Sequence, residues 1–341
     1  MTKQVDVAVA GATGAVGEAM LAVLEQRDFP VRRLYPLASE RSAGKQIRFR
    51  GETLTIGNLA EFDFAQTQVG LFSAGGSVSE EHAPRAAKAG CVVVDNTSAF
   101  RRAPDIPLVV PEVNAHAISG YRNRGIIANP NCSTIQMVVA LAPLHRAAGI
   151  RRINVATYQA VSGSGASAIR ELTEQSKRVL DGREIDAPHS YPKQIAFNAL
   201  PHIDVFMDNG YTREEMKMVW ETQKILEDEG ILVNPTAARV PVVYGHSEAV
   251  HIETRDKLSA EQATSLLSQA PGVTVLDTRE PGGYATAVTE AAHHDAVFVS
   301  RIREDISHAH GLDLWIVSDN VRKGAALNSV QIAEILVREF L

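Results

Sequence analysis

The sequence predicts a two-domain α/β protein, in which a doubly wound parallel sheet is followed by an α+β domain with a mostly antiparallel sheet. Apolar strands alternate with amphipathic helices over residues 1–131, which is typical of a parallel sheet. From about residue 151 the chain changes to longer strand-like runs with fewer helices between them. The length of 341 residues is sufficient for two hydrophobic cores.

The elements of the first domain follow from hydrophobic periodicity. Val5–Ala10 is predicted to be a buried strand that leads through a glycine loop into a helix ending near Gln26. We expect further strands at Val31–Leu37, Val69–Ser73, Cys91–Asp95 and Gly125–Ala128, and a helix at Ser79–Ala89.

The second domain is predicted to mix strands and helices. The expected strands are Asn154–Val161, Arg239–Val243, Ala249–Thr254, Ala296–Arg301 and Leu312–Val317. The expected helices are Ala166–Leu180, Arg213–Glu227, Ser259–Gln269 and a last one over about Val321–Phe340.

Composition indicates an ordinary soluble protein, with 45% apolar and 22% charged residues. A net charge of −6 gives no reason to expect nucleic acid or an anionic membrane as partner. We expect no transmembrane helix and no signal peptide, because the chain lacks long apolar runs and begins with a polar segment followed by a strand. Two cysteines do not make a disulfide framework, so we expect a cytoplasmic location.

The loop after the first strand carries Gly11, Gly14 and Gly17 at G-x-x-G-x-x-G spacing. Glycines permit a tight turn and let backbone N–H groups approach a pyrophosphate at the start of a helix. Ala12 departs from the G-x-G-x-x-G dinucleotide fingerprint. The strand–loop–helix context nevertheless favours a Rossmann-type nucleotide site over a turn that serves packing alone.

The residues after the second strand favour NADP over NAD. Ser39, Arg41, Ser42 and Lys45 are donors suited to a 2′-phosphate. Glu40 supports the opposite interpretation, because a carboxylate there could bind a ribose hydroxyl. A solvated loop without a ligand is the third alternative.

Cys132 lies in Asn129-Pro130-Asn131-Cys132-Ser133-Thr134, between an apolar strand and an apolar helical run. A thiol at a helix start faces unpaired N–H groups and the helix dipole, which favour the nucleophilic thiolate. A buried structural cysteine explains the same pattern equally well, because free cysteines are commonly buried. Both interpretations stay open on these residues alone.

A nucleophilic cysteine needs a base, and His246 is the most suggestive histidine. It follows Gly245 after the predicted strand Arg239–Val243, so we expect it at a sheet edge. A lone histidine is more often structural, but Arg239 could bind a substrate carboxylate bidentately. Gln159 ends another predicted strand and could orient a carbonyl group.

Further residues could bind anions. Arg101 follows the end of a strand of the first domain. Glu214 and Lys217 are spaced i, i+3, so both can reach one pocket, although spacing alone favours a surface ion pair. We expect no metal site, because His308-x-His310 and His293-His294 lack further ligands at a telling spacing.

These motifs together resemble the aspartate-β-semialdehyde dehydrogenase family over nearly the whole chain. The segments that carry the resemblance are Gly11–Gly17, Leu37–Lys45, Asn96–Arg101, Asn129–Thr134, Gln159–Gly163, Arg239–Pro241, Gly245–Ser247 and Asp319–Ala326.

The resemblance implies roles for these residues. Cys132 would be the nucleophile that forms an acyl-enzyme, His246 the acid/base and Gln159 the residue that positions the substrate. Arg239 would bind the α-carboxylate of the substrate and Glu214 its α-amino group. Arg101, Asn131 and Lys217 would form the phosphate site. NADP would lie along residues of both domains, namely Gly11, Thr13, Gly14, Ala15, Val16, Gly17, Ser39, Arg41, Ser42, Ser73, Ser162, Gly163 and Asn320.

The contact of Asn320 with NADP implies that the last helix packs on the nucleotide domain. The expected domains are therefore 1–131 completed by 321–341, which binds NADP, and 132–320, which carries catalysis and dimerisation. The resemblance also implies a homodimer or a dimer of dimers.

The implied reaction is the reversible, NADP-dependent reductive dephosphorylation of L-aspartyl-4-phosphate to L-aspartate-4-semialdehyde, toward lysine and diaminopimelate, threonine and methionine. Two alternatives remain. An N-acetyl-γ-glutamyl-phosphate reductase shares the Cys/His plan, although its acylated substrate has little use for Glu214. A catalytically silent nucleotide-binding relative is the other alternative, and the joint presence of Cys132, His246, Gln159 and Arg239 is evidence against it.

Overall fold

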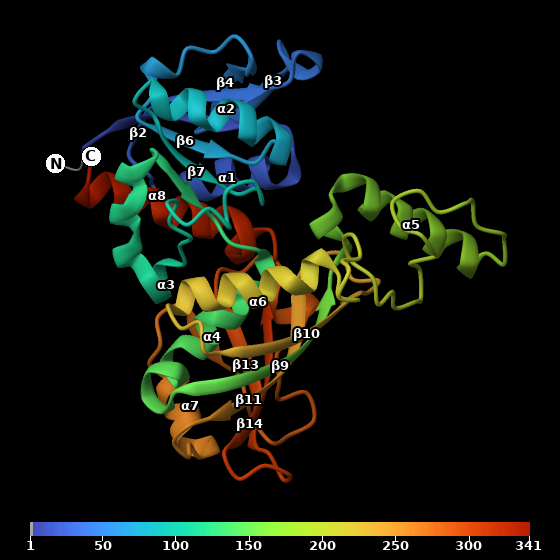
Figure 1. The fold of residues 1–341 in the computed structure, drawn as a ribbon. Coiled ribbons are helices and arrows are strands. Elements are labelled where there is room, and N and C mark those ends of the chain that lie inside the picture. The colour runs from blue at the N-terminus through green and yellow to red at the C-terminus, as the bar shows by residue number, and fades with distance from the viewer. Residues whose placement is uncertain (1–2) are drawn as a thin grey trace. The chain divides into compact units, whose positions relative to one another are not determined.

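The computed structural model describes residues 3–341, which form two compact units (Figure 1). The first unit runs to Asn131 and includes Ala325–Leu341, and the second comprises Cys132–Gly324.

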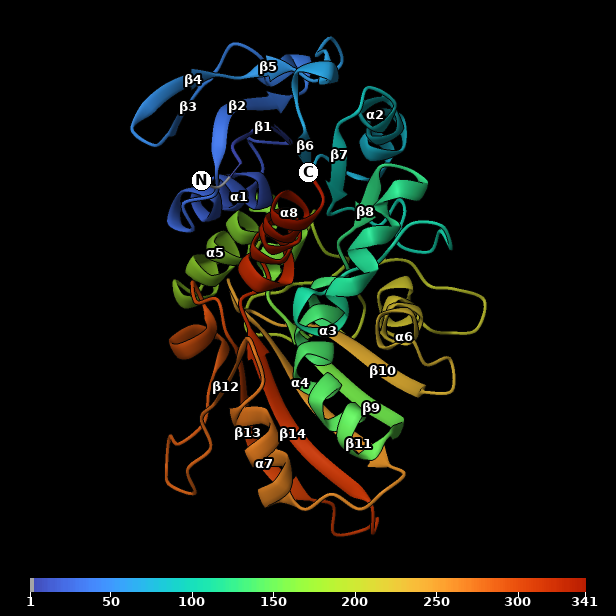
Figure 2. The same cartoon turned by 90° about the vertical axis from the view of Figure 1, so that its left-hand side faces the viewer.

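The first unit is built on a parallel sheet, as predicted, and its strand order is β5-β2-β1-β6-β7-β8. Its strands are β1 (Val5–Ala10), β2 (Val31–Ala38), β5 (Gly57–Asn58), β6 (Val69–Phe72), β7 (Val92–Asp95) and β8 (Ile126–Ala128). Its main helices are α1 (Ala15–Gln26), α2 (Gly76–Lys88), the short α3 (Pro111–Asn114) and α8 (Leu327–Glu339). Figure 2 shows α8 beside α1, with which it shares one apolar core, whereas α2 contacts β6, β7 and β8.

A β-hairpin in this unit was not predicted. It consists of β3 (Gln46–Phe49) and β4 (Glu52–Thr55), joined at Arg50 and Gly51, which both have positive φ. Gln46-Ile47-Arg48-Phe49 does alternate polar and apolar residues, and Phe49 is buried with Ile47 and Leu54 packed against the core, so this signal could have predicted the hairpin.

The glycine loop between β1 and α1 has no room for a side chain at position 11 or at position 17. Gly11 has φ +87°, and its backbone lies close to the segment that follows β6. A Cβ at this position would be 2.9 Å from Ala74 N. A Cβ on Gly17 would lie 2.1 Å from the carbonyl oxygen of Gly11. The first helical turn can therefore approach the strand end only because position 17 is glycine.

The second unit contains a mixed sheet with the strand order β10-β9-β11-β14-β13-β12. Its strands are β9 (Ile150–Gln159), β10 (Leu232–Arg239), β11 (His246–Thr254), β12 (Val273–Val275), β13 (Val297–Glu304) and β14 (Gly311–Ser318). The pairings β9–β11, β11–β14 and β13–β14 are antiparallel, and the outer pairings β9–β10 and β12–β13 are parallel.

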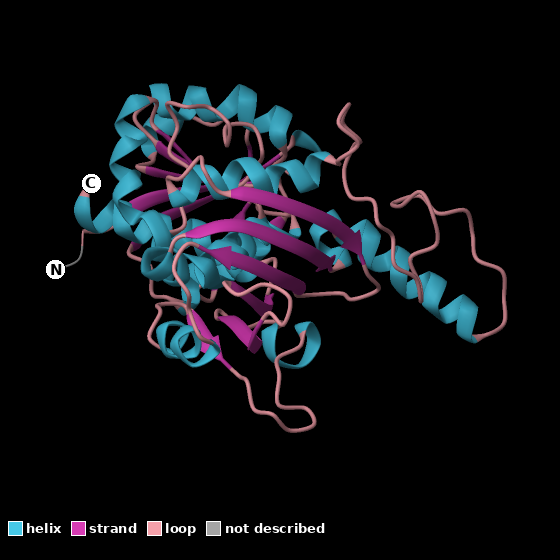
Figure 3. Ribbon diagram, turned by 60° about the horizontal axis from the view of Figure 1, so that its bottom comes forward, coloured by secondary structure: helices cyan, strands magenta, loops and turns pink. Residues whose placement is uncertain are grey.

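Helices of the second unit pack on and around this sheet. They are α4 (Cys132–Ala148), α5 (Ala166–Leu180), α6 (Arg213–Leu226) and α7 (Ala260–Ser268). The apolar helix α4 contacts β9, β11, β13 and β14 as well as α6 and α7. Figure 3 shows α5 and the loop after it extending away from the strands, and its buried side chains pack with Val161 in a separate small core.

One strand was predicted in the wrong place. The expected strand Arg239–Val243 is a connection instead, and the strand that precedes it, β10, ends at Arg239. Pro241 has no N–H to contribute to a sheet, and the apolar residues around it are used differently. The carbonyls of Val242 and Val243 accept from the N–H groups of Val161 and Ser162, which closes the connection over the end of β9.

The last helix also differs from its predicted form. It begins with a π-helical turn at Arg322–Ala326 and continues as α8. The Asp319 carboxylate accepts from the N–H groups of Val321 and Arg322 at 2.8 Å each, which satisfies the start of this turn. Within residues 3–341, every helix is too short or too polar to cross a lipid bilayer.

Replacing Gly17 by alanine tests the packing of the glycine loop. We expect Gly17→Ala to lower the free energy of unfolding by about 3 kcal/mol, because the new Cβ meets backbone that cannot yield. Gly76→Ala, at the start of α2, is the matched control, since no heavy atom lies within 4 Å of its new Cβ. Urea unfolding of both variants checks this, and equal stability of the two would contradict it.

Candidate active site

Cys132 is the first residue of α4, and its Sγ lies 3.3 Å from Nε2 of His246. The predicted place of Cys132 at a helix start is confirmed. His246 was expected at a sheet edge, and this was wrong: it is the first residue of β11, which lies inside the sheet between β9 and β14. Its side chain is fully buried.

A backbone hydrogen bond determines which nitrogen of His246 carries the proton. The N–H of Ala160 donates to Nδ1 at 3.0 Å. An amide nitrogen can only donate, so Nδ1 must have a lone pair and the neutral ring carries its hydrogen on Nε2. Nε2–H therefore points its proton at Cys132 Sγ. A thiolate is the stronger acceptor for this hydrogen bond, and in this tautomer Nε2 of His246 has no lone pair with which to remove a proton from a thiol.

Electrostatics favour the same neutral form of His246. Burial, and next the positive charge of Arg239, lower the pKa of the imidazole to about 3. At neutral pH the helix start at Cys132 and the Nε2–H donor of His246 thus stabilise the thiolate together, with no imidazolium present.

Gln159 and Glu214 are neighbours in the same buried site. Gln159 ends β9, and its Nε2 donates to Glu214 Oε1 at 3.2 Å and to Thr157 Oγ1 at 3.3 Å. Glu214 is buried, and Lys217 donates to its Oε2 at 3.0 Å and to Asp204 at 2.9 Å. Burial lowers the pKa of Lys217, but the negative charges of Glu214 and Asp204 outweigh it and raise that pKa. The predicted pair is therefore ionic but mostly buried rather than solvated.

A capping box fixes the orientation of α6 and thereby of Glu214. Thr212 Oγ1 accepts from the N–H of Glu215, and the Glu215 carboxylate accepts from the N–H of Thr212 at 2.7 Å. The same carboxylate accepts from Ala237 N of β10 at 2.9 Å. The first turn of α6 is thus tied to the sheet, and Glu214 is directed at the end of β9.

Arg239, at the end of β10, is the other buried cation of this site. One of its terminal nitrogens donates to the carbonyl of Ala160 at 2.7 Å. A Cβ at Gly163 would lie 3.1 Å from that guanidinium and 3.7 Å from Nε2 of His246. The absence of a side chain at Gly163 therefore leaves room beside both residues.

Asn320 holds two loops of this unit together. Its side chain bonds to Ser162 Oγ at 3.0 Å, and its Oδ1 accepts from Gly245 N at 2.9 Å. The residue before His246 is thereby held to the segment after Gln159. Ser162, Gly163 and Asn320, which we expected to bind the nucleotide, thus lie in the second unit.

Arg101 and Asn131, two of the predicted phosphate-binding residues, belong to the first unit and are buried there. The Arg101 guanidinium donates to the carbonyls of Asn129 at 2.8 Å and Asn96 at 3.0 Å. The Asn129 side chain is held by Asn328 of α8 at 2.7 Å. These bonds order the chain immediately before Cys132.

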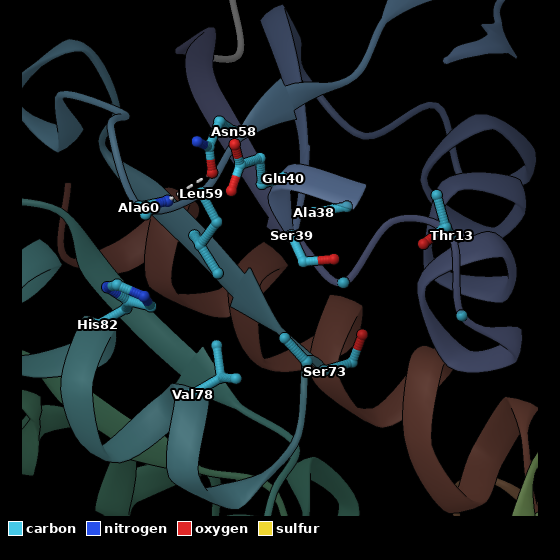
Figure 4. A pocket seen from close by; sticks show the side chains of 13 residues that line it. Thr13, Ala38, Ser39, Glu40, Asn58, Leu59, Ala60, Ser73, Val78 and His82 are labelled. Carbon is cyan, nitrogen blue, oxygen red and sulfur yellow. Dashed lines mark hydrogen bonds between the residues drawn. The ribbon is translucent and has the colours of Figure 1, made fainter. Parts of the chain in front are cut away.

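A pocket of about 420 Å³ opens beside the glycine loop of the first unit (Figure 4). Of the predicted nucleotide-binding residues, Gly11, Thr13, Gly14, Ser39 and Ser73 line it. Ala15, Val16 and Gly17 belong to the adjoining helix start, and Arg41 and Ser42 belong to the short 3-10 turn after Ser39. The lining is suited to the phosphates of a nucleotide, because Gly11 and Gly14 allow a ligand to approach the backbone of the loop closely.

Sequence reasoning missed part of this pocket. Asn58 is the last residue of the very short strand β5, which carries no detectable pattern, and Leu59 and Ala60 follow it. Val78 and His82 lie one turn apart on α2, so helical periodicity could have placed them on one face. Glu40 also lines the pocket.

Within the described residues, no cluster of three or more His, Cys, Asp and Glu side chains could hold a metal ion. Cys91, the other cysteine, is buried in the first unit, and burial raises the pKa of its thiol to about 12. Its thiol is accordingly unreactive at neutral pH.

Comparison with known proteins matches each of the two units to a semialdehyde dehydrogenase family model. Residues 6–121 match the family model for the semialdehyde dehydrogenase NAD binding domain, and residues 141–323 match that for the semialdehyde dehydrogenase dimerisation domain. The aspartate-semialdehyde dehydrogenase of Legionella pneumophila is 63% identical over 100% of this chain and 98% of its own.

Solved structures are similar as well. The crystal structure of aspartate semialdehyde dehydrogenase II from Vibrio cholerae complexed with ASA matches with a TM-score of 0.97 at 57% identity, over 100% of both chains. That of aspartate semialdehyde dehydrogenase with NADP from Candida albicans matches with a TM-score of 0.77 at 25% identity, over 99% of both chains.

The pH dependence of stability tests the neutral state of His246. Its pKa is about 3 in the folded chain and about 6.5 in the unfolded chain. The unfolded state therefore binds more protons between these values, so the wild type should lose stability relative to His246→Gln as pH falls below about 6.5. Urea unfolding of both proteins from pH 7.5 to 4.5 measures this. A relative gain for the wild type at low pH would indicate an imidazolium–thiolate pair instead.

Proposed function

The chain belongs to the aspartate-semialdehyde dehydrogenase family, and we propose that its Cys132 and His246 catalyse the reversible reductive dephosphorylation of L-aspartyl-4-phosphate to L-aspartate-4-semialdehyde. It is an oxidoreductase with an NAD(P)-binding domain, and this reaction leads toward lysine and diaminopimelate, threonine and methionine. The observation that carries the proposal is the 3.3 Å contact of Cys132 Sγ with the protonated Nε2 of His246.

In the first step the Cys132 thiolate attacks the acyl carbon of aspartyl phosphate. A C–S bond forms, and the C–O bond to phosphate breaks as the phosphate leaves with its electron pair and takes up a proton from solvent. The product is a thioester on Cys132, so one difficult displacement becomes two easier steps. The nicotinamide supplies the hydride that reduces this thioester.

In the second step the C–S bond breaks and the aldehyde departs. The electron pair returns to Cys132 as a thiolate, so no base is needed to regenerate the nucleophile. We expected His246 to be the acid/base, and its tautomer supports a narrower role. Nε2–H donates to the sulfur, and to substrate oxygen as negative charge develops there.

The substrate-binding roles follow from charge. Arg239 is a buried guanidinium suited to the α-carboxylate, and the Glu214 carboxylate is suited to the α-ammonium group. Gln159, which donates to Glu214, positions the substrate between strand end and helix. We assign phosphate binding to Lys217, Arg101 and Asn131.

We further propose NADP as the cofactor. Thr13, Ser39 and Ser73 line the pocket with hydroxyl groups, and the exposed Arg41 in the adjoining 3-10 turn can reach a 2′-phosphate together with Ser42. The contacts we propose also include the loop amides of Gly14–Gly17 and the residues Ser162, Gly163 and Asn320. The match to a structure with NADP supports this choice.

The proposed assembly is a homodimer, and the proposed location is the cytoplasm. The dimerisation-domain match covers the second unit, whose sheet face opposite α4 carries the exposed side chain of Tyr158 and is suited to pairing. The other binding partners we propose are the small-molecule substrates, and we propose no binding of nucleic acid or of a membrane surface.

A turnover assay tests the reaction. With aspartate semialdehyde, phosphate and NADP⁺, the wild type should form NADPH, and Cys132→Ala should lose at least about 10³-fold in kcat because the acyl-enzyme cannot form. Cys91→Ala is the matched thiol control and should keep its activity. Turnover only with N-acetylglutamate semialdehyde would favour the rival reductase, and activity in Cys132→Ala would refute covalent catalysis.

Replacing Arg41 tests the cofactor preference. Arg41→Ala should lower the ratio of kcat/KM for NADP over NAD by about tenfold or more, because a charge-assisted bond to the 2′-phosphate is lost. Glu40→Gln, its neighbour in the same turn, should leave that ratio unchanged or raise it. Steady-state kinetics with both cofactors measure the ratio, and an unchanged value in Arg41→Ala would remove Arg41 from the site.

A further inference from the structure

Glu248 is a buried carboxyl group that the proposed mechanism does not use. It lies in β11, two residues after His246, and is 0% exposed. Neither of its carboxyl oxygens has a hydrogen-bond partner in the structure. Glutamate is almost never fully buried unless it is paired, because the desolvation of its charge is costly. A residue in this state needs an explanation.

The position of Glu248 relates it to the catalytic residues. His246 and Glu248 alternate by two along β11, so both side chains face α4. Glu248 pairs across the sheet with Thr157 of β9, whose hydroxyl accepts from Gln159. The pair Glu248 and Thr157 therefore lies next to Gln159 and His246 on the same face of the sheet.

Gln136 is the corresponding residue on α4. It lies one helical turn after Cys132 and is also 0% exposed. Its Nε2 is 3.5 Å from the backbone carbonyl oxygen of His246, and its Oε1 has no partner. The unpaired acceptor of Gln136 and the unpaired carboxyl of Glu248 can satisfy one another if the carboxyl is protonated, since its O–H can then donate to Oε1.

We propose that Glu248, in its neutral form, is a positioning residue that acts with Gln136 to hold the first turn of α4 against β11 and so sets the contact between Cys132 and His246. The inference rests on the roles proposed above for Cys132 and His246. Burial raises the pKa of Glu248 well above its usual range, and the neighbouring Gln136 amide lowers that pKa by less, which agrees with a neutral carboxyl. The 3.3 Å contact of Sγ with Nε2 tolerates little displacement. A hydrogen bond between Gln136 and Glu248 would therefore affect the position of the Cys132 sulfur directly.

The experiment compares Glu248→Leu with Glu248→Gln. Two rates are measured at pH 7: the alkylation of Cys132 by iodoacetamide in the Cys91→Ala background, and kcat with aspartate semialdehyde. We expect Glu248→Leu to lower both rates by about 10- to 100-fold with KM within about twofold, because the nucleophile is displaced while the substrate-binding residues remain. Glu248→Gln, which keeps a neutral donor and an acceptor, should stay within about twofold in both rates.

Thr254→Val is the matched control. Thr254 is a buried polar residue on the same face of β11, at the end of the strand far from His246, and its hydroxyl donates to the carbonyl of Asp256. This variant should lower the melting temperature and leave both rates unchanged. A loss in Thr254→Val as large as that in Glu248→Leu would show that the rates report general destabilisation, and would overturn the proposal.

Gln136→Leu provides an independent test that does not depend on the folding of Glu248→Leu. It should reproduce the loss in both rates, and the double variant Gln136→Leu/Glu248→Leu should lose no more than either single variant. Unchanged rates in Gln136→Leu, multiplicative losses in the double variant, or a loss in Glu248→Gln equal to that in Glu248→Leu would each overturn the proposal. Alkylation needs no turnover, so it decides this inference even if the wild type proves inactive toward aspartate semialdehyde.

Discussion

The hydrogen bond from the N–H of Ala160 to Nδ1 of His246 is the interaction on which the chemistry of the site depends. It places the ring proton on Nε2 and aims it at the sulfur of Cys132. It also couples the catalytic residues to the sheet, because Ala160 follows the end of β9 and its carbonyl accepts from Arg239. The backbone of this one residue thus orients both the imidazole of His246 and the guanidinium of Arg239.

Burial gives this arrangement its electrostatic character. An imidazolium would be costly so far from water and beside Arg239, so the positive charge in the site belongs to Arg239 and Lys217 rather than to His246. Glu214 and Asp204 balance Lys217, and the capping box of α6 holds Glu214 in place. A neutral donor and a helix start stabilise a thiolate at Cys132, so in the mechanism we propose it serves as nucleophile and leaving group without proton transfer at sulfur.

Gln136 and Glu248 are buried polar residues next to the site. Gln136 and Glu248 repeat, one helical turn along α4 and two residues along β11, the helix-to-strand juxtaposition of Cys132 and His246. An apolar pair of the same size would pack there with less desolvation cost. The presence of a carboxyl group therefore points to positioning, since a hydrogen bond fixes a distance and a direction more narrowly than an apolar contact does.

The sequence by itself determined the parallel sheet, the glycine loop, the start of α4 at Cys132 and the residue types of the site. These depend on short-range patterns such as apolar runs, glycine spacing and the i, i+3 pair Glu214 and Lys217. It placed His246 at a sheet edge and Arg239–Val243 in a strand, because a local apolar run does not reveal which neighbour a strand pairs with. Only the tertiary structure decided the tautomer of His246, the burial of Lys217 and the place of Glu248 below the nucleophile. Each of these depends on packing between segments that are separate in the chain, and this packing exists only once the strands are paired and the helices lie on them.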